Sequence, residues 1–425
     1  LATISIQSLT NTGLFKNAQK AKDETQNAAE NQAKILNEYE DELNKYVFDN
    51  KNKTDWTGKV NKPKLMTGMT AIKFNEPAGD EKAKEGSTVK TTDTDAAWYD
   101  YDAKKWANAQ TQDGSMWVWI PRFAYKVNSS TKTFDVVFLK DTTNTYLDNG
   151  TEKDAEKEGY IVHPAFKNES STGYENGGWD KELTGIWVSK FEAGYASGNN
   201  SVTPTASSIK YTQASAWVAG AEVGTDSIST ARNYLDGEYG IKSGNIYGLS
   251  SSSKDSHMMK NSEWGAVAYL AQSKYGLNGT NIYINNANLR NSQTSAYAIT
   301  GCAGETEDAA ELGVKIDNST KKPVSTDNTK KIYTWTQKSG TKASTTGTIY
   351  GVYDMSGGTW ERTAGLVNNG NENLATYGQS LLNALNNGKS SKYVTVYPHN
   401  ASVDKNGANI DTASTAIAMI TMGFA

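Results

Sequence analysis

Few residues of this chain have the types and spacing that metal binding or thiol chemistry requires. Cys302 is the single cysteine, so the chain cannot form a disulfide framework. The histidines, His163, His257 and His399, are scattered along 425 residues, whereas a zinc site needs three or four ligands that converge. We therefore expect no metal and no cofactor, and we interpret Cys302 as a small buried side chain.

The carboxylates near the strongest motif have structural explanations. Asp354 follows Tyr353 and precedes Met355 in a glycine-rich turn. A carboxylate in such a turn accepts hydrogen bonds from backbone N–H groups, and we predict this role for Asp354. Glu361, directly after Trp360, is expected to cap or pair within the fold rather than to act in catalysis. We identify no Ser/His/Asp constellation and no phosphate-binding glycine loop, and we expect a protein that is not an enzyme.

These carboxylates belong to residues 351–362, a segment that strongly constrains the chain. Val352 and Met355 are spaced to enter a core, and Gly357-Gly358 forces a turn with positive φ before Trp360 buries a large ring. The order Asp-Met-x-Gly-x-x-Trp-Glu resembles the signature of the formylglycine-generating-enzyme/sulfatase-modifying domain. That domain is a variant of the C-type lectin fold.

Three further segments resemble the same family in chain order. Residues 117–125 resemble an upstream strand, and residues 185–194, which include Trp187, resemble the strand that opens the domain. Residues 257–270, which include Trp264, resemble the amphipathic helix behind it. We expect Trp187, Trp264 and Trp360 to lie largely buried around the turn at Gly357-Gly358. The fold hosts oxidases, lectins and hypervariable receptors, so the resemblance alone does not give a function. The oxidases need two cysteines and related iron enzymes need three clustered histidines, which makes an oxidoreductase the weakest alternative.

Composition restricts the kinds of partner that the protein is expected to bind and the location where it is expected to act. The 43 basic and 47 acidic residues are mixed along the chain and give a net charge of −4, so a nucleic-acid partner is not expected. Abundant Trp and Tyr, with loops rich in Thr, Ser, Asn and Gly, suit strands joined by long connections. No segment approaches about 18 consecutive apolar residues, so we predict no membrane span in the chain as given. We expect an extracellular protein of a cell-surface appendage.

The N-terminal residues are the second informative feature. Residues 1–9 are short and apolar, with Leu1 expected to be a processed end, and residues 14–47 have the pattern of a long polar helix. Its apolar or small positions have nearly four-three spacing. Those that we expect to carry assembly are Leu14, Ala18, Ala21, Ala28, Ile35 and Tyr39. Residues 1–46 resemble the tail end of a prepilin-type N-terminal helix of Gram-positive surface proteins. The alternative is a helix that packs only on its own globular domain.

We therefore predict an α+β protein, with a long N-terminal α-helix followed by a C-type-lectin-like mixed domain with long loops. Residues 1–47 are the expected assembly helix with its apolar leader, residues 48–94 a connector with one strand candidate at residues 70–74, and residues 95–425 the lectin-like domain. Insertions are expected at about residues 141–180 and 305–343.

The C-terminal end departs from the family pattern, which closes with an Arg-Gly-Gly turn and a terminal Phe-Arg. A domain without its last strands would leave an open sheet edge, and such edges pair readily with other chains. We expect residues 3–9 or 416–424 to complete a neighbouring subunit by strand addition. The residues assigned to this exchange are Ile4, Ile6, Leu9, Ile417, Ile420 and Phe424. The alternative is that each terminus packs within its own subunit.

Together the resemblances imply a structural subunit of an extracellular filament or pilus-like appendage that displays a lectin-like domain. The expected partner is a further copy of the chain, in a homopolymer, with a glycan or a host or cell-surface protein as a second ligand. The alternative function is a monomeric, membrane-tethered adhesin that binds a glycan or a protein.

Overall fold

The computed structural model describes residues 20, 56–80, 88–112, 114–168, 179, 181–191, 259–284, 300–307, 314–316, 323–325, 331–357, 363, 365–367 and 395–397. The chain divides into two units, Leu1–Thr54 and Asp55–Ala425. In the first unit the description covers only Lys20, which is helical. Apart from Lys20, the helix predicted over residues 14–47 and the leader over residues 1–9 therefore lie outside the described residues.

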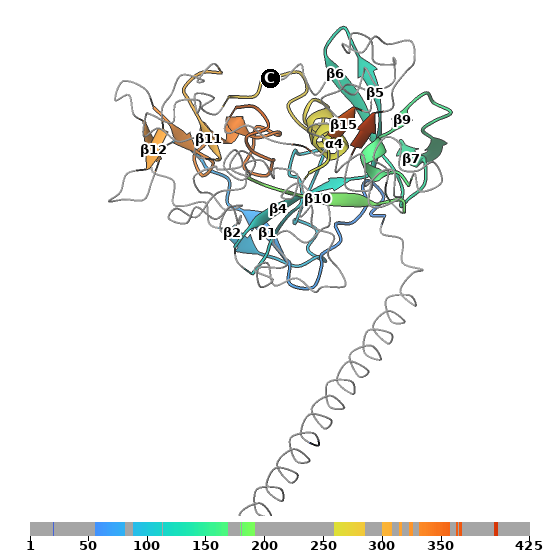
Figure 1. The fold of residues 1–425 in the computed structure, drawn as a ribbon, viewed down its shortest axis with the longest axis horizontal. Helices are drawn as coiled ribbons and strands as arrows, with labels where there is room; N and C mark the ends of the chain where they lie inside the picture. The colour runs from blue at the N-terminus through green and yellow to red at the C-terminus, as the bar shows by residue number, and fades with distance from the viewer. Residues whose placement is uncertain are drawn as a thin grey trace, which may run out of the picture. The chain divides into compact units, whose positions relative to one another are not determined.

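A five-stranded antiparallel sheet is the largest sheet among the described residues of the second unit (Figure 1). Its strands are β1 (Thr70–Phe74), β2 (Thr88–Lys90), β3 (Asn108–Gln110), β4 (Met116–Pro121) and β10 (Gly185–Ser189), in the order β10-β4-β3-β1-β2. Residues of β4 and β10 face each other in register, with Val118 opposite Val188 and Trp119 opposite Trp187. β-Branched and aromatic side chains suit such half-buried pleated strands. This sheet brings residues near 110 and near 190 into one layer.

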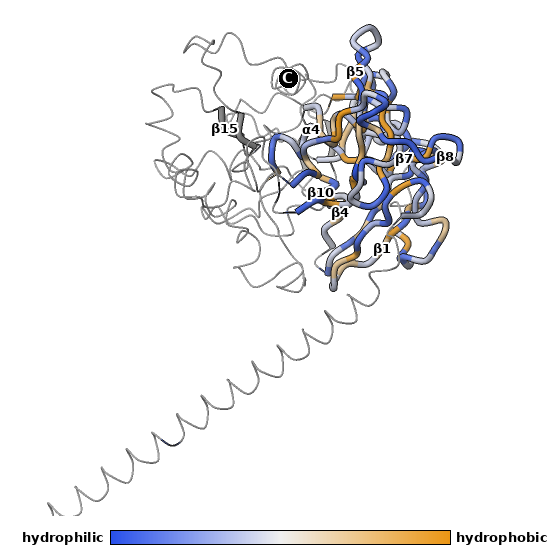
Figure 2. Tube along the Cα trace, turned by 90° about the vertical axis from the view of Figure 1, so that its right-hand side faces the viewer, coloured by the Kyte–Doolittle hydropathy of each residue, from blue (hydrophilic) through white to orange (hydrophobic). Residues whose placement is uncertain are grey.

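A second sheet has the order β6-β5-β9 and is formed by β5 (Phe123–Asn128), β6 (Thr133–Phe138) and β9 (Ile161–Val162). Beside it, β7 (Thr145–Asp148) and β8 (Thr151–Asp154) form a hairpin that is largely hydrophilic in Figure 2. Asn149 and Gly150 join these two strands with φ values of 50° and 82°. A two-residue turn with both φ values positive matches the twist of a hairpin, which explains the Asn-Gly pair.

Three further strand pairs and two short 3-10 helices are present among the described residues. The pairs are β11 (Cys302–Ala303) with β14 (Tyr333–Thr334), β12 (Val314–Ile316) with β13 (Pro323–Ser325), and the parallel pair β15 (Gly365–Val367) with β16 (Thr395–Tyr397). The short 3-10 helices are η2 (Pro164–Phe166) and η9 (Gly340–Ala343).

The helix predicted over residues 257–270 is confirmed as α4 (Asn261–Ala271). The Glu263 carboxylate accepts a hydrogen bond from the backbone N–H of Lys260 at 2.8 Å, which stabilises the start of the helix. Tyr269 stacks on Phe134 of β6, with ring centroids 4.0 Å apart. The helix is therefore fixed against the second sheet through its aromatic face. None of the helices in the described ranges is long and apolar enough to cross a membrane.

The predicted α+β class is wrong. The regular secondary structure of the described residues consists mainly of strands in antiparallel sheets, α4 is their one complete α-helix, and the class is mainly β. The helical periodicity of residues 14–47 is a strong local signal, and it dominated the prediction. Short strands such as β7 and β8 carry several charged residues and give a much weaker signal in sequence.

The second unit also begins earlier than predicted and uses the expected insertions in its core. Residues 48–94 were expected to form a connector, but β1 and β2 within them are strands of the five-stranded sheet. Residues 141–180 include Phe166, which is fully buried, and residues 305–343 include Trp335, which packs against Phe74. Phe166 and Trp335 stand within largely polar sequence, so their burial was not predicted.

Candidate functional site

Lys190 lies directly after β10 and has no exposed surface. Its Nζ donates hydrogen bonds to Asn108 Oδ1 at 3.1 Å, to the Ile349 carbonyl oxygen at 2.6 Å and to the Gly351 carbonyl oxygen at 2.9 Å. Asn108 begins β3, and β4 lies between β3 and β10 in the sheet. One side chain therefore connects two strands of the sheet with the segment that leads into the Asp354 motif.

Aromatic rings enclose the Lys190 amine. Its Nζ lies 4.8 Å from the ring centroid of Phe74, 5.4 Å from that of Tyr353 and 5.9 Å from that of Phe191. Burial lowers the pKa of Lys190 well below its ordinary value of 10.5, because desolvation penalises the charged amine. The described hydrogen-bond acceptors are neutral oxygens, so none of them offsets that penalty with a full negative charge.

The orientation of the Asn108 amide follows from its other contacts. Asn108 Nδ2 donates to the carbonyl oxygens of Trp106 and Tyr350, each at 2.9 Å, which leaves Oδ1 on the side of Lys190. Asn108 is fully buried as well. Sequence reasoning identified neither Asn108 nor Lys190 as a functional residue. The sequence offered one signal for them, because each is a polar residue close to aromatic residues: Asn108 follows Trp106, and Lys190 precedes Phe191.

Asp354 follows Tyr353, whose ring lies beside the Lys190 amine, and it accepts buried hydrogen bonds of its own. It is 1% exposed and adopts a φ of 63°, and its Oδ2 accepts hydrogen bonds from the Thr300 hydroxyl and, at 2.8 Å, from the Gly301 N–H. The predicted acceptor role is therefore confirmed, but the N–H group belongs to a distant segment. A Cβ atom on Gly301 would lie 2.9 Å from Phe191 Cε1, so glycine permits this close approach.

The structure brings only some of the predicted signature residues together. Tyr353 is buried and stacks on Phe191, Met355 packs against the core, and Gly357 has the expected positive φ of 81°. Trp187 and Trp264, which were expected to be largely buried around this turn, are half-buried in two different clusters. Trp360, Glu361 and the assembly positions at Ile4 to Tyr39 and Ile417 to Phe424 lie outside the described residues.

His163 and Cys302 are both buried. His163 Nδ1 accepts the Ala165 N–H at 3.2 Å, and burial lowers the pKa of His163 to about 3. Cys302 is 1% exposed on β11, as expected for a small core side chain. His257 and His399 lie outside the description. Within the described ranges, no group of three His, Cys, Asp or Glu side chains could hold a metal ion.

Arg122 is a third buried group that connects distant segments. It is 1% exposed, forms an ion pair with Glu182, and donates to the carbonyl oxygens of Phe166 at 3.0 Å and Thr143 at 3.2 Å. Burial lowers the pKa of Arg122 from its ordinary value. Arg122 and Lys190 therefore both donate hydrogen bonds to backbone carbonyl oxygens of segments that lie far apart in the sequence.

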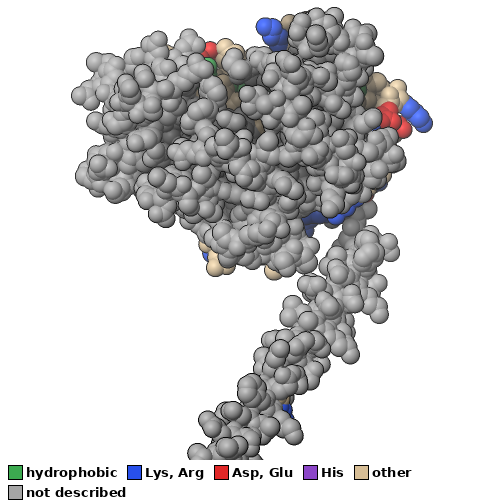
Figure 3. Space-filling model, viewed as in Figure 1, with side chains coloured by type: hydrophobic (Ala, Val, Ile, Leu, Met, Phe, Trp, Pro, Cys, Tyr) green, Lys and Arg blue, Asp and Glu red, His purple; other side chains and the backbone are tan. Residues whose placement is uncertain are grey.

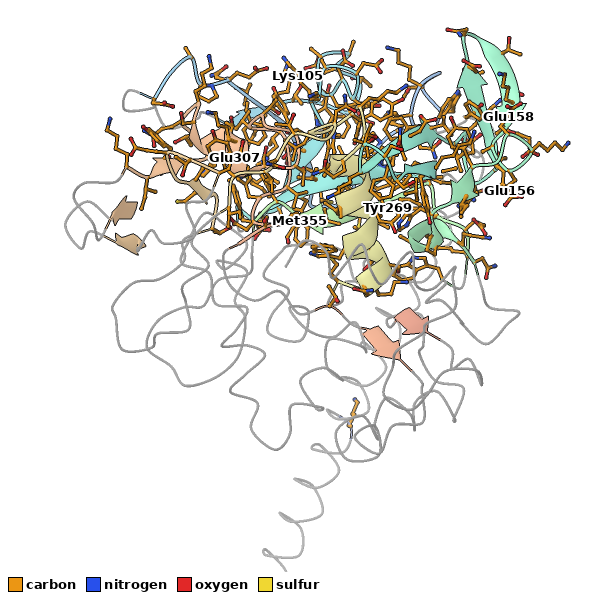
Figure 4. All side chains as sticks on the ribbon, turned by 90° about the horizontal axis from the view of Figure 1, so that it is seen from above. Lys105, Glu156, Glu158, Tyr269, Glu307 and Met355 are labelled. Carbon is orange, nitrogen blue, oxygen red and sulfur yellow. The ribbon has the colours of Figure 1, made fainter. Side chains whose placement is uncertain are left out.

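Some charged side chains lie at the periphery of the described part of the chain. In Figure 4, Glu156 and Glu158 lie at the periphery of the described side chains, whereas Tyr269 and Met355 lie nearer the middle. On the face shown in Figure 3, the charged side chains that are visible also lie at its edges.

Comparisons of the chain with models of known families, with curated proteins and with solved structures give no match. The chemistry of the site is therefore interpreted from its own geometry.

Proposed function

We propose that this chain is a structural subunit of an extracellular filament or pilus-like appendage, which displays the mainly β unit on its surface. The observation that carries the proposal is the division of the chain into Leu1–Thr54 and Asp55–Ala425. The first unit contains the regularly spaced small and apolar positions that suit contacts between copies. Assembly and display are thereby assigned to separate units.

The interior of the second unit supports a display role. Lys190 and Arg122 each connect segments far apart in sequence, and both use backbone carbonyl oxygens as acceptors. Buried hydrogen-bonded groups with these partners specify one arrangement of the chain, because each lost contact would leave a buried polar group unsatisfied. A unit held in this way can present loops on a fixed frame.

The test uses charge in the first unit. Ala21→Glu and Ala28→Glu would place a carboxylate in a close-packed contact between copies, where an unpaired charge is costly. Ala29→Glu is the matched control, because it makes the same change one residue away from the predicted seam. We expect loss of polymer in the first two variants, seen by light scattering and negative-stain microscopy, with unchanged near-UV circular dichroism.

The outcomes separate the alternatives. If Ala21→Glu and Ala28→Glu both polymerise like the control, the proposal is wrong. A wild-type chain that attaches to cells as a monomer and binds a glycan or a protein would instead favour the adhesin.

A further inference from the structure

The contact between Lys190 and Asn108 places an amine against a carboxamide in a dry environment. Both side chains are fully buried, and Lys190 Nζ lies 3.1 Å from Asn108 Oδ1. Reacting groups that are held about 3–3.5 Å apart gain effective molarities of roughly 10⁵–10⁸ M over free reactants. The Asn108 carbonyl carbon is bonded directly to the contacted oxygen, so the same contact brings the amine close to the carbon that it would attack.

The other contacts of the amine indicate where its electron pair lies. A neutral lysine amine has two N–H bonds and one lone pair. All three contacted oxygens can only accept, and the two shorter contacts, to the carbonyl oxygens of Ile349 and Gly351, keep the two N–H bonds of the neutral amine. Loss of one proton from the charged amine therefore removes the longest of the three hydrogen bonds, the one donated to Asn108 Oδ1, and leaves a lone pair on the side that faces Asn108. Burial favours the neutral form of the amine, since it lowers the pKa of Lys190.

We propose that Lys190 and Asn108 form an intramolecular isopeptide cross-link, an amide bond between Lys190 Nζ and Asn108 Cγ. Nζ attacks Cγ, a proton passes from Nζ to Nδ2, and the bond between Cγ and Nδ2 breaks with release of ammonia. No oxidant or reductant is consumed, and the atoms of amine and carboxamide are all accounted for in amide and ammonia. The carbonyl oxygens of Trp106 and Tyr350 hold Nδ2, the departing nitrogen.

The cross-link would join positions that are 82 residues apart in the chain. It would connect β3 to the end of β10 across β4, and the surrounding rings would protect the new amide from water. A covalent bond that closes a long loop restricts the unfolded chain most strongly. The inference does not depend on the filament proposal, because a chain of any oligomeric state could form this bond.

The deciding experiment is the intact mass of the denatured wild-type chain, followed by tryptic mapping. We expect a chain lighter than its sequence mass by one ammonia, no cleavage after Lys190, and a branched peptide that joins the fragments containing Asn108 and Lys190. Lys190→Met and Asn108→Ala should each restore the full sequence mass. Asn61→Ala is the matched control, because Asn61 is equally buried and its amide also donates to two carbonyl oxygens, at 2.9 and 3.0 Å.

Each result of the mass measurement decides the proposal without reference to the folding of the variants. A folded wild-type chain at its full sequence mass, cleaved normally after Lys190, overturns it. Loss of ammonia without the branched peptide also overturns it, because the loss would then come from another asparagine.

Discussion

Lys190 Nζ lies 3.1 Å from Asn108 Oδ1, although a whole strand separates the two residues in the sheet. Asn108 belongs to β3, Lys190 directly follows β10, and β4 lies between these two strands. The backbone N–H of Lys190 continues the strand pairing by donating to the Met116 carbonyl oxygen at 2.9 Å. Its side chain then spans the width of β4. Lys190 thus extends the strand pairing through its backbone, and its amine forms hydrogen bonds in the interior.

Replacement of Lys190 by Met should destabilise the second unit. The change leaves three buried oxygens without their donor, and unsatisfied buried groups cost about 1–3 kcal/mol each. We expect the free energy of unfolding, measured with a chemical denaturant, to fall by about 3 kcal/mol or more. Lys140→Met, which removes a solvent-exposed pair with Glu152, should change it little. Equal stability of the two variants would contradict the structural role of Lys190.

His163 should make the protein sensitive to acid. Its pKa is about 3 in the folded protein and 6.5 ordinarily, so below pH 6.5 only the unfolded state takes up this proton. The contribution of neutral His163 to the free energy of unfolding is complete above pH 6.5. It falls by about 1.4 kcal/mol per pH unit as the pH drops toward 3. His163→Phe should keep the aromatic packing against Phe123 and Tyr269 and lose this dependence. The measurement is the difference in unfolding free energy between wild type and variant across this pH range; a constant difference would refute the prediction.

The two roles of Asp354 can be separated by substitution. Asp354→Ala and Asp354→Gly both remove the acceptor for the Gly301 N–H and the Thr300 hydroxyl. Only alanine is strained at a φ of 63°, so Asp354→Ala should be less stable than Asp354→Gly by about 1 kcal/mol. Asp354→Asn should be the mildest change, because Asn keeps an acceptor oxygen and tolerates this conformation. Thermal unfolding of the three variants tests this order, and a glycine variant no better than alanine would disagree with it.

Two glycines offer a matched pair for testing the packing of β10. A Cβ atom on Gly185 would lie 2.4 Å from Trp119 Cζ2 and 2.7 Å from the Ile120 carbonyl oxygen. We expect Gly185→Ala to lower the free energy of unfolding by about 1–3 kcal/mol through overpacking. Gly79→Ala should be neutral or slightly stabilising, because nothing lies within 4 Å of its Cβ position. Similar denaturation midpoints for both variants would show that β10 does not pack on Trp119 as described.

Local features were predictable from the sequence, and long-range contacts were not. The strand at Thr70–Phe74 and the positive φ of Gly357 follow from local residue patterns and glycine chemistry, and the helix at Asn261–Ala271 was expected from the resemblance of residues 257–270 to a family helix. The contact between Lys190 and Asn108 depends on the order of strands in the sheet, which no local pattern contains. The mainly β class was not predicted for a related reason. Short segments with charged residues form strands because they pair with neighbouring strands, and their local sequence does not show this.

The oligomeric state of the purified full chain tests the proposed function most directly. Light scattering coupled to size-exclusion chromatography, with negative-stain microscopy of the same fractions, should show polymers and filaments that Ala28→Glu abolishes and Ala29→Glu retains. A wild-type chain that stays monomeric over the whole accessible concentration range, with no filaments in any fraction, would contradict the account.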